Sequence, residues 1–164
     1  MSTKNKIKVG IVGASGYTGG ELLRLLVNHE GVEIVFAYSK TNTGKLVSDV
    51  YTDLIDEVNI KFTNTIKESD VIFLCLGHGK SYNFLLKNSI NQKTKIIDLS
   101  QDFRLEKSIT IGKNTKNFTY GLPELQKKLI KSSKNIANPG CFATALQLAC
   151  LLYTSPSPRD NSGS

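Results

Sequence analysis

The residue best placed to do chemistry is Cys141, which follows Pro139 and Gly140 and opens an apolar, helix-forming run over 141–152. Pro139 ends the preceding segment, and Gly140 lets the backbone turn sharply because it has no Cβ. Cys141 then lies in the first helical turn, where unpaired backbone N–H groups and the helix dipole favour a thiolate. The dipole supplies only about 0.3–1 kcal/mol, so an efficient nucleophile also needs a nearby base. From this pattern alone, Cys141 is either a nucleophile or a half-buried structural cysteine.

A glycine-rich segment near the start of the chain is typical of a nucleotide-binding loop. Gly13, Gly16 and Gly19 recur at every third position, between a predicted strand at 7–12 and a predicted helix at 19–29. In dinucleotide-binding folds the first glycine permits the turn, the second lets the pyrophosphate approach, and the third packs the helix closely. The phosphates then lie over the helix N-terminus. The alternative is a plain glycine-rich turn.

The second predicted strand, at 32–38, distinguishes between the two nicotinamide cofactors. A site for NAD usually has an acidic residue at the end of this strand, where it binds the ribose 2′-OH. Here Glu33 lies at the beginning of the strand, and Ser39 and Lys40 follow its end. A hydroxyl group and a cation suit a 2′-phosphate, so the sequence favours NADP.

The elements that would position these residues alternate between strands and helices. Additional strands are predicted at 59–63, 70–76, 95–99 and 135–137, and additional helices at 81–90 and 125–131. The alternation predicts an α/β fold with a Rossmann-like, doubly wound parallel sheet. The helix at 19–29 is expected to pack through Leu22, Leu25 and Leu26. Ligands of such sheets bind at the carboxyl ends of the strands.

The composition excludes several classes of protein. The net charge is +7, but the three arginines and eighteen lysines are scattered and form no dense basic run, so we expect no nucleic-acid partner. Three cysteines without a Cys-x-x-Cys pair argue against a disulfide framework and against a bound metal. The chain shows no signal sequence and no apolar segment long enough to span a bilayer. We therefore expect a cytoplasmic protein with no membrane partner.

Four segments form a specific combination across most of the chain. Their sequences are Gly-Ala-Ser-Gly-Tyr-Thr-Gly at 13–19, Asp-Leu-Ser-Gln-Asp-Phe-Arg at 98–104, Tyr-Gly-Leu-Pro-Glu-Leu at 120–125 and Asn-Pro-Gly-Cys at 138–141. In this order they closely resemble the N-acetyl-γ-glutamyl-phosphate reductases of arginine biosynthesis, and the resemblance covers about residues 6–152. It implies an NADP-binding Rossmann domain over 1–140 and the start of a catalytic domain over 141–152. Residues 153–164, which hold two of the four prolines, are expected to be a disordered or foreign tail.

The resemblance also implies a reaction. Cys141 would attack the acyl carbon of N-acetylglutamyl 5-phosphate, release phosphate and become a thioester. Hydride from NADPH would then give N-acetylglutamate 5-semialdehyde. Two alternatives remain: a reductase of a related acyl phosphate, such as aminoadipyl phosphate in lysine synthesis, and a non-catalytic NADP-binding module.

The glycine pattern and the resemblance together suggest the other site residues. Cofactor contacts are expected at Gly13, Ser15, Gly16, Tyr17, Thr18, Gly19, Ser39, Lys40, Gly77 and His78. Substrate contacts are expected at Ser100, Asp102, Arg104 and Asn138. His78 lies in Leu-Gly-His-Gly at 76–79, which is similar to a Leu-Pro-His-Gly segment of the family with glycine in place of proline. A structural role is the alternative for His78, and a buried pair that fixes the loop is the alternative for Asp102 and Arg104.

The resemblance further implies a second, α+β domain after the cysteine helix. In the family, that domain carries the histidine that activates the thiol, most of the substrate pocket and the interface of a homo-oligomer. Neither His29 nor His78 matches the activating histidine. We therefore expect the 164-residue chain to be inactive or nearly so by itself.

Overall fold

The computed structural model describes residues 5–105 and 107–154. The strands are β1 (Ile7–Val12), β2 (Val32–Tyr38), β3 (Phe62–Thr63), β4 (Val71–Leu74), β5 (Lys95–Asp98), β6 (Ser108–Ile111), β7 (Asn114–Tyr120) and β8 (Asn135–Ala137). The helices are α1 (Tyr17–Val27), α2 (Val47–Val50), α3 (Lys80–Lys87), α4 (Pro123–Ser132) and α5 (Cys141–Thr154), with a 3₁₀ turn at Thr52–Leu54. Within the described ranges, none of the helices has the length and apolar character needed to cross a membrane.

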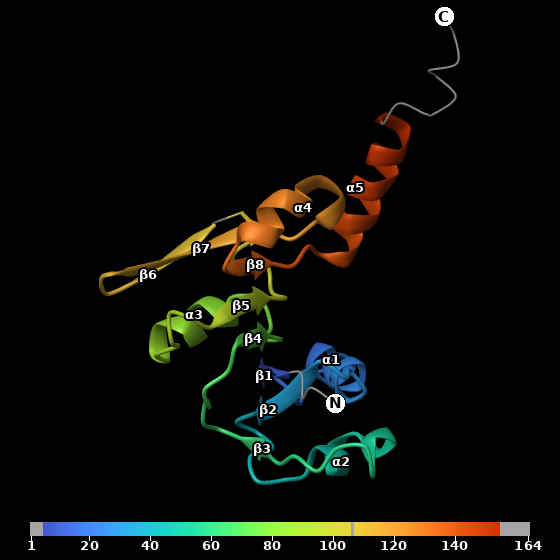
Figure 1. Cartoon of the computed structure of the whole chain (residues 1–164), viewed down its shortest axis with the longest axis vertical. Helices are drawn as coiled ribbons and strands as arrows, with labels where there is room; N and C mark the ends of the chain where they lie inside the picture. Colours follow the sequence, from blue (N-terminus) through green and yellow to red (C-terminus); the bar gives the residue numbers. More distant parts are fainter. Residues whose placement is uncertain (1–4, 106, 155–164) are drawn as a thin grey trace, which may run out of the picture.

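The strands form one eight-stranded sheet in the order β3-β2-β1-β4-β5-β8-β7-β6. Neighbouring strands are parallel, except that β6 runs antiparallel to β7. Helices α1 and α3 lie on opposite sides of the sheet (Figure 1). The predicted Rossmann-like, doubly wound fold is therefore confirmed.

One row of backbone pairs determines where the parallel strands end. Across six neighbouring strands, the aligned residues are Tyr38, Val12, Leu74, Asp98, Ala137 and Tyr120. The first residue after a strand donates its N–H to the aligned carbonyl of a neighbouring strand. These bonds, 2.8–3.0 Å long, run from Gly13 to Tyr38, Cys75 to Val12, Leu99 to Leu74, Asn138 to Asp98 and Gly121 to Ala137. The loops that carry the sequence motifs therefore begin at one edge of the sheet.

The core has two parts, one on each face of the sheet. Ile11 of β1 belongs to the same cluster as Leu23 of α1. The next residue, Val12, belongs to the opposite cluster, with Phe84 and Leu85 of α3. Successive side chains of a strand point to opposite faces of the sheet, so β1 packs against a helix on each face. For this reason its consecutive residues are apolar.

Helix α1 packs through Leu22 and Leu26 as predicted, but not through Leu25. Leu22 is buried, but Leu25 is 72% exposed, and Leu23 is buried in its place. The positions that face the sheet are Gly19, Leu22, Leu23 and, partly buried, Leu26, which follow the i, i+3, i+4, i+7 spacing of one helix face. Gly19 belongs to this face because its lack of a side chain lets the helix approach the sheet.

The hairpin of β6 and β7 is absent from the sequence-based prediction. Its strands are rich in threonine and asparagine, and Ile109 and Phe118 are its buried apolar residues. The Phe118 ring stacks on Phe103, with centroids 4.0 Å apart and 4° between the ring planes. A distant aromatic contact thus anchors a segment whose local pattern is mostly polar.

Helix α5 extends beyond its predicted boundary at residue 152 and ends at Thr154. Figure 1 shows it projecting away from the sheet beyond α4. The rest of the predicted tail, 155–164, lies outside the described residues.

The packing of α1 can be tested with two leucine substitutions on the same helix. Leu23→Ala should lower the free energy of unfolding by about 2–5 kcal/mol, because it leaves a cavity in the core. Leu25→Ala should change it by no more than about 0.5 kcal/mol, because that side chain faces water. Urea unfolding followed by circular dichroism measures both. Equal losses for the two variants would contradict the orientation of α1.

Candidate active site

The glycine loop joins β1 to α1 and is held against two neighbouring strands. The N–H groups of Gly13 and Ala14 both donate to the Tyr38 carbonyl, at 3.0 Å. Gly13 has a φ of 80°, and a Cβ there would lie 2.5 Å from the Cys75 carbonyl oxygen. A Cβ on Gly19 would lie 2.4 Å from the Gly13 carbonyl oxygen. The turn and the close helix packing both exclude larger residues, as the dinucleotide pattern requires.

A tyrosine outside the sequence motifs also supports this loop. The Tyr51 hydroxyl donates to the carbonyls of Ala14, at 3.1 Å, and Gly16, at 2.8 Å. Burial raises the pKa of Tyr51, so the hydroxyl retains the proton that it donates. The Arg24 guanidinium, bonded through Nε to Asp53 at 2.6 Å, lies 5.2 Å from the centroid of the Tyr51 ring. Because Tyr51 is 35 residues from Gly16, no local pattern could reveal this contact.

A groove of about 710 Å³ runs between the glycine loop, the end of β2 and helix α3, and we call it the glycine-loop groove. The predicted cofactor residues that line it are Gly13, Ser15, Gly16, Ser39, Lys40 and Gly77. Lys80 and Lys87 of α3 line it as well, although the sequence analysis did not select them. None of its described lining residues is acidic. Its charge therefore favours an anionic ligand.

The end of β2 supplies hydroxyl groups to this groove. Ser39 is buried, and its Oγ lies 2.6 Å from Ser15 Oγ and 3.3 Å from Thr41 Oγ1. Lys40, the next residue, is exposed. Glu33 lies near the opposite end of β2, where it aligns with Lys8. The acidic residue of this strand is thus remote from the groove.

Cys141 is exposed in the first turn of α5 and lines a second groove of about 790 Å³, which we call the cysteine groove. The predicted site residues Thr18, His78, Arg104 and Asn138 line it too. Glu124 at the start of α4 also lines it and was not selected from the sequence, although it lies in the Leu-Pro-Glu motif.

The two grooves adjoin along two short segments. In the glycine loop, Gly16 lines the glycine-loop groove and Thr18 lines the cysteine groove. In the turn after β4, Gly77 lines the glycine-loop groove and His78 lines the cysteine groove. A ligand extending from one groove to the other would therefore pass these segments and approach Cys141.

Arg104 holds the backbone that leads to Cys141. Its Nε donates to the Asn138 carbonyl at 2.9 Å, and its Nη2 donates to the Leu99 carbonyl at 3.0 Å. A Cβ on Gly140 would lie 2.8 Å from Arg104 Nη1. The backbone φ of Gly140 is not positive. A side chain at this position would displace the end of the Arg104 side chain.

Asp102 and Ser100 hold the loops together and line neither groove. Both carboxylate oxygens of Asp102 accept backbone N–H groups, from Gly79 at 2.6 Å and from Tyr82 at 3.0 Å. Ser100 is buried, and its Oγ donates to Asp98 Oδ2 at 2.7 Å. These contacts give both side chains a role in holding the loops. The substrate contacts expected for Ser100 and Asp102 stay predictions.

His78 has one ring nitrogen occupied by the backbone. The Gln101 N–H donates to His78 Nδ1 at 3.2 Å. A neutral imidazole with Nδ1 as acceptor carries its proton on Nε2. His78 therefore offers a hydrogen-bond donor at Nε2, and lines the cysteine groove.

Two other predicted cofactor residues, Tyr17 and Gly19, line neither groove. Tyr17 is 88% exposed. Gly19 is buried at the contact between α1 and the loop. Among the residues described by the structure, no group of three or more His, Cys, Asp or Glu side chains could hold a metal ion.

Comparison with known proteins agrees with this geometry. A family model described as semialdehyde dehydrogenase, NAD binding domain, matches residues 8–133. Over 146 residues the chain is 53% identical to the N-acetyl-gamma-glutamyl-phosphate reductase of Flavobacterium johnsoniae and 49% identical to that of Christiangramia forsetii. Each alignment covers 88% of this chain and 44% of the relative, so the chain spans less than half the length of these proteins.

Solved structures share the fold at lower sequence identity. Aspartate semialdehyde dehydrogenase II of Vibrio cholerae, complexed with ASA, has a TM-score of 0.67 at 19% identity and covers 88% of this chain and 45% of that one. The aspartate semialdehyde dehydrogenase of Candida albicans with NADP has a TM-score of 0.60 at 18% identity and covers 93% of this chain and 48% of that one. With its glycine loop and most of its parallel sheet inside the matched region, the chain belongs to the family of semialdehyde dehydrogenase NAD-binding domains.

Proposed function

We propose that this chain provides the NADP-binding site and the catalytic cysteine of an N-acetyl-γ-glutamyl-phosphate reductase. The observation that carries the proposal is the junction of the two grooves, which brings Cys141 next to the glycine loop. The names of the similar proteins favour N-acetylglutamyl phosphate over aminoadipyl phosphate as the substrate.

The glycine-loop groove fits a dinucleotide phosphate in three respects. Positions 13 and 19 leave no space for a Cβ, so the loop can turn tightly and α1 can pack closely, which directs the N-terminus of α1 toward the place of the pyrophosphate. Lysines line the groove, and none of its described lining residues is acidic. Ser39 and Lys40 supply a hydroxyl and a cation at the end of β2, where a 2′-phosphate would bind. Bound NADPH supplies the hydride.

Cys141 would act twice in the reaction. Its thiolate attacks the acyl carbon, the bond from that carbon to the phosphate oxygen breaks, and phosphate leaves with the bonding electrons. Addition of hydride to the thioester carbon then expels the thiolate and leaves the aldehyde. The first N–H groups of α5 lack intrahelical partners, so they can stabilise the oxyanion that forms in each step.

Arg104 and His78 would bind the acyl phosphate in the cysteine groove. Arg104 is held by two carbonyls beside Gly140, which places a permanent positive charge near Cys141. The Nε2 donor of His78 suits a phosphate or oxyanion oxygen, whereas a general base would need an acceptor there. We therefore assign His78 to binding and not to activation of the thiol.

We also propose a boundary between two functional units at residue 140. The sheet and its covering helices would form the nucleotide-binding domain, and α5 would begin the catalytic domain. Support comes from α5 itself, on which Phe142 is 75% exposed and Leu152 is 78% exposed. The complete enzyme would be a cytoplasmic homo-oligomer that acts on a small-molecule acyl phosphate.

The preference for NADP can be tested at Lys40. Lys40→Gln removes a cation from the proposed 2′-phosphate site, so the dissociation constant for NADPH should rise about tenfold, or about 1.4 kcal/mol. The constant for NADH should change little. Lys45→Gln is the matched control, because Lys45 is exposed and lines neither groove. If wild-type protein bound NADH as tightly as NADPH in a fluorescence titration, the cofactor assignment would fail.

The nucleophile can be tested by acylation. Incubating the chain with N-acetylglutamyl phosphate should attach an N-acetylglutamyl group to the peptide that contains Cys141, as detected by mass spectrometry. Cys141→Ala should abolish the adduct, and Cys150→Ala should retain it. An adduct that persists in Cys141→Ala, or one that is lost equally in Cys150→Ala, would be evidence against the proposed nucleophile.

Alkylation separates a catalytic cysteine from structural ones. Burial, with a smaller effect of nearby Asp98, raises the pKa of Cys75 to about 12, so this thiol stays protonated at neutral pH. Cys141 should therefore react with iodoacetamide at least about tenfold faster than Cys75. Cys150, exposed further along α5, controls for accessibility and should react more slowly than Cys141. Equal, slow labelling at all three would instead favour a non-catalytic NADP-binding module.

A further inference from the structure

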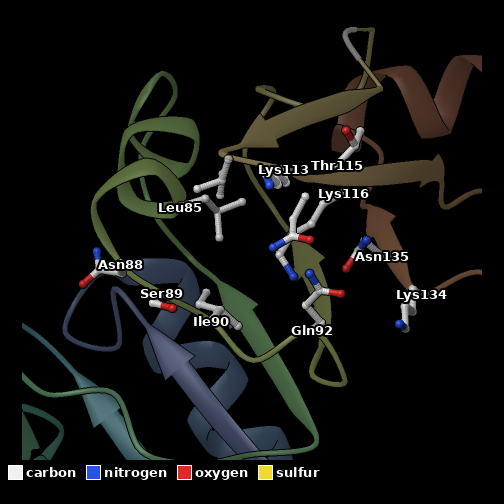
Figure 2. A pocket seen from close by; sticks show the side chains of 12 residues that line it. Leu85, Asn88, Ser89, Ile90, Gln92, Lys113, Thr115, Lys116, Lys134 and Asn135 are labelled. Atoms are coloured by element: carbon white, nitrogen blue, oxygen red, sulfur yellow. The ribbon is translucent and has the colours of Figure 1, made fainter.

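A separate pocket lies at the opposite end of the strands from the two grooves, beside the amino ends of β7 and β8. Its volume is about 210 Å³, and it lies between the end of α3 and the β6–β7 hairpin (Figure 2). The lining includes Leu85, Ile90 and three lysines, Lys113, Lys116 and Lys134. We call it the basic pocket. The proposed reaction uses none of these residues.

The basic pocket holds positive charge that the protein itself does not neutralise. Lys116 on β7 is partly buried, and burial together with nearby Lys134 lowers its pKa. No acidic residue lines the pocket in the described part of the chain. Among the described residues, the ion pairs are those that Arg24 forms with Glu21 and Asp53. An anion between Lys116 and Lys134 would relieve their repulsion.

Asn135 adds an unsatisfied polar atom to the pocket lining. The residue is only 4% exposed, and its Nδ2 donates to the Asn117 carbonyl at 3.0 Å. Its Oδ1 is buried without a hydrogen-bond partner among the described residues. Figure 2 shows this oxygen turned toward the side of the pocket that holds Gln92. A buried acceptor without a donor is costly, so a ligand with an O–H group would stabilise this site.

One carbonyl near the end of α3 is satisfied by donors of the helix itself. Helix carbonyls near a C-terminus favour cations. Here both the backbone N–H and the Nδ2 of Asn88 donate to the Phe84 carbonyl, at 3.1 and 2.8 Å. That carbonyl is therefore occupied by donors from the helix end.

We propose that the basic pocket binds a small oxyanion of the phosphate class that retains one O–H group. The charged oxygens would lie against Lys116 and Lys134, and the O–H would donate to Asn135 Oδ1. The volume of about 210 Å³ is below the roughly 300–1,000 Å³ typical of pockets for larger ligands. The pocket thus suits an ion such as monohydrogen phosphate and not a dinucleotide.

The proposal can be tested by limited acetylation of lysines, quantified by mass spectrometry, with and without inorganic phosphate. Chloride keeps the ionic strength constant. Phosphate at twice its dissociation constant should slow acetylation of Lys116 and Lys134 about threefold. Lys61, exposed near β3 at the far end of the sheet, should be unaffected in the same sample. No slowing, or equal slowing at all three lysines, would overturn the proposal.

Two further comparisons test the parts of the site. Lys134→Met should remove the protection of Lys116, and Lys61→Met, the matched control, should preserve it. Lys134 is exposed, so the substitution is compatible with folding. Sulfate, which has no O–H group at neutral pH, should protect less than phosphate. Equal protection by the two ions would overturn the role assigned to Asn135.

Discussion

The arrangement of the site depends on one register shared by six strands. Because the aligned residues pair at the same level, the first N–H of each following loop meets a carbonyl of a neighbouring strand. A slip of one residue in any of these strands would break that bond and turn its side chains to the other face. The glycine loop, the turn at 75–79 and the segment 138–141 therefore begin at one edge, although they are far apart in the sequence.

At this end of the sheet, some polar side chains hold the loops in place through hydrogen bonds. Others lie at the surface, where a ligand can reach them. Asp102 binds the start of α3 through both oxygens, and Arg104 binds the segment that leads to Cys141. Burial raises the pKa of Asp98 in the aligned row, and the hydrogen bond from Ser100 opposes that shift. Cys141, by contrast, is exposed. The division fits the proposed function, because hydrogen bonds lower the cost of charge held inside the protein, whereas the proposed nucleophile must reach its substrate.

Much of the fold could be predicted, because apolar runs bounded by glycine and polar residues give clear strand limits. The bounds of β1, β2 and β8 agree with the prediction. The β6–β7 hairpin was missed because its place in the sheet depends on the stacking of Phe118 on Phe103, which no local pattern contains. The face of α1 was predicted correctly at Leu22 and Leu26 but not at Leu25, because leucines at 22, 23, 25 and 26 fit more than one helix face.

The site was predictable where a motif carries its own geometry. Gly13 and Cys141 are such positions, since each lies at a junction between a strand and a helix. Ser100 and Asp102 could not be judged in this way, because a polar residue in a loop can face either a ligand or a backbone amide. Tyr51 and the lysines of α3 reach the loop or the groove from other elements. Their roles are set by tertiary structure.

A crystal structure of the chain with bound NADPH tests the central claim most directly. The account predicts that the adenosine end lies beside Ser39 and Lys40, and that the nicotinamide ring passes Thr18 and His78 to reach the cysteine groove. Its reactive carbon should then be open toward the sulfur of Cys141, with no protein atoms between them. A dinucleotide bound elsewhere, or a sulfur separated from the ring by protein, would contradict the account.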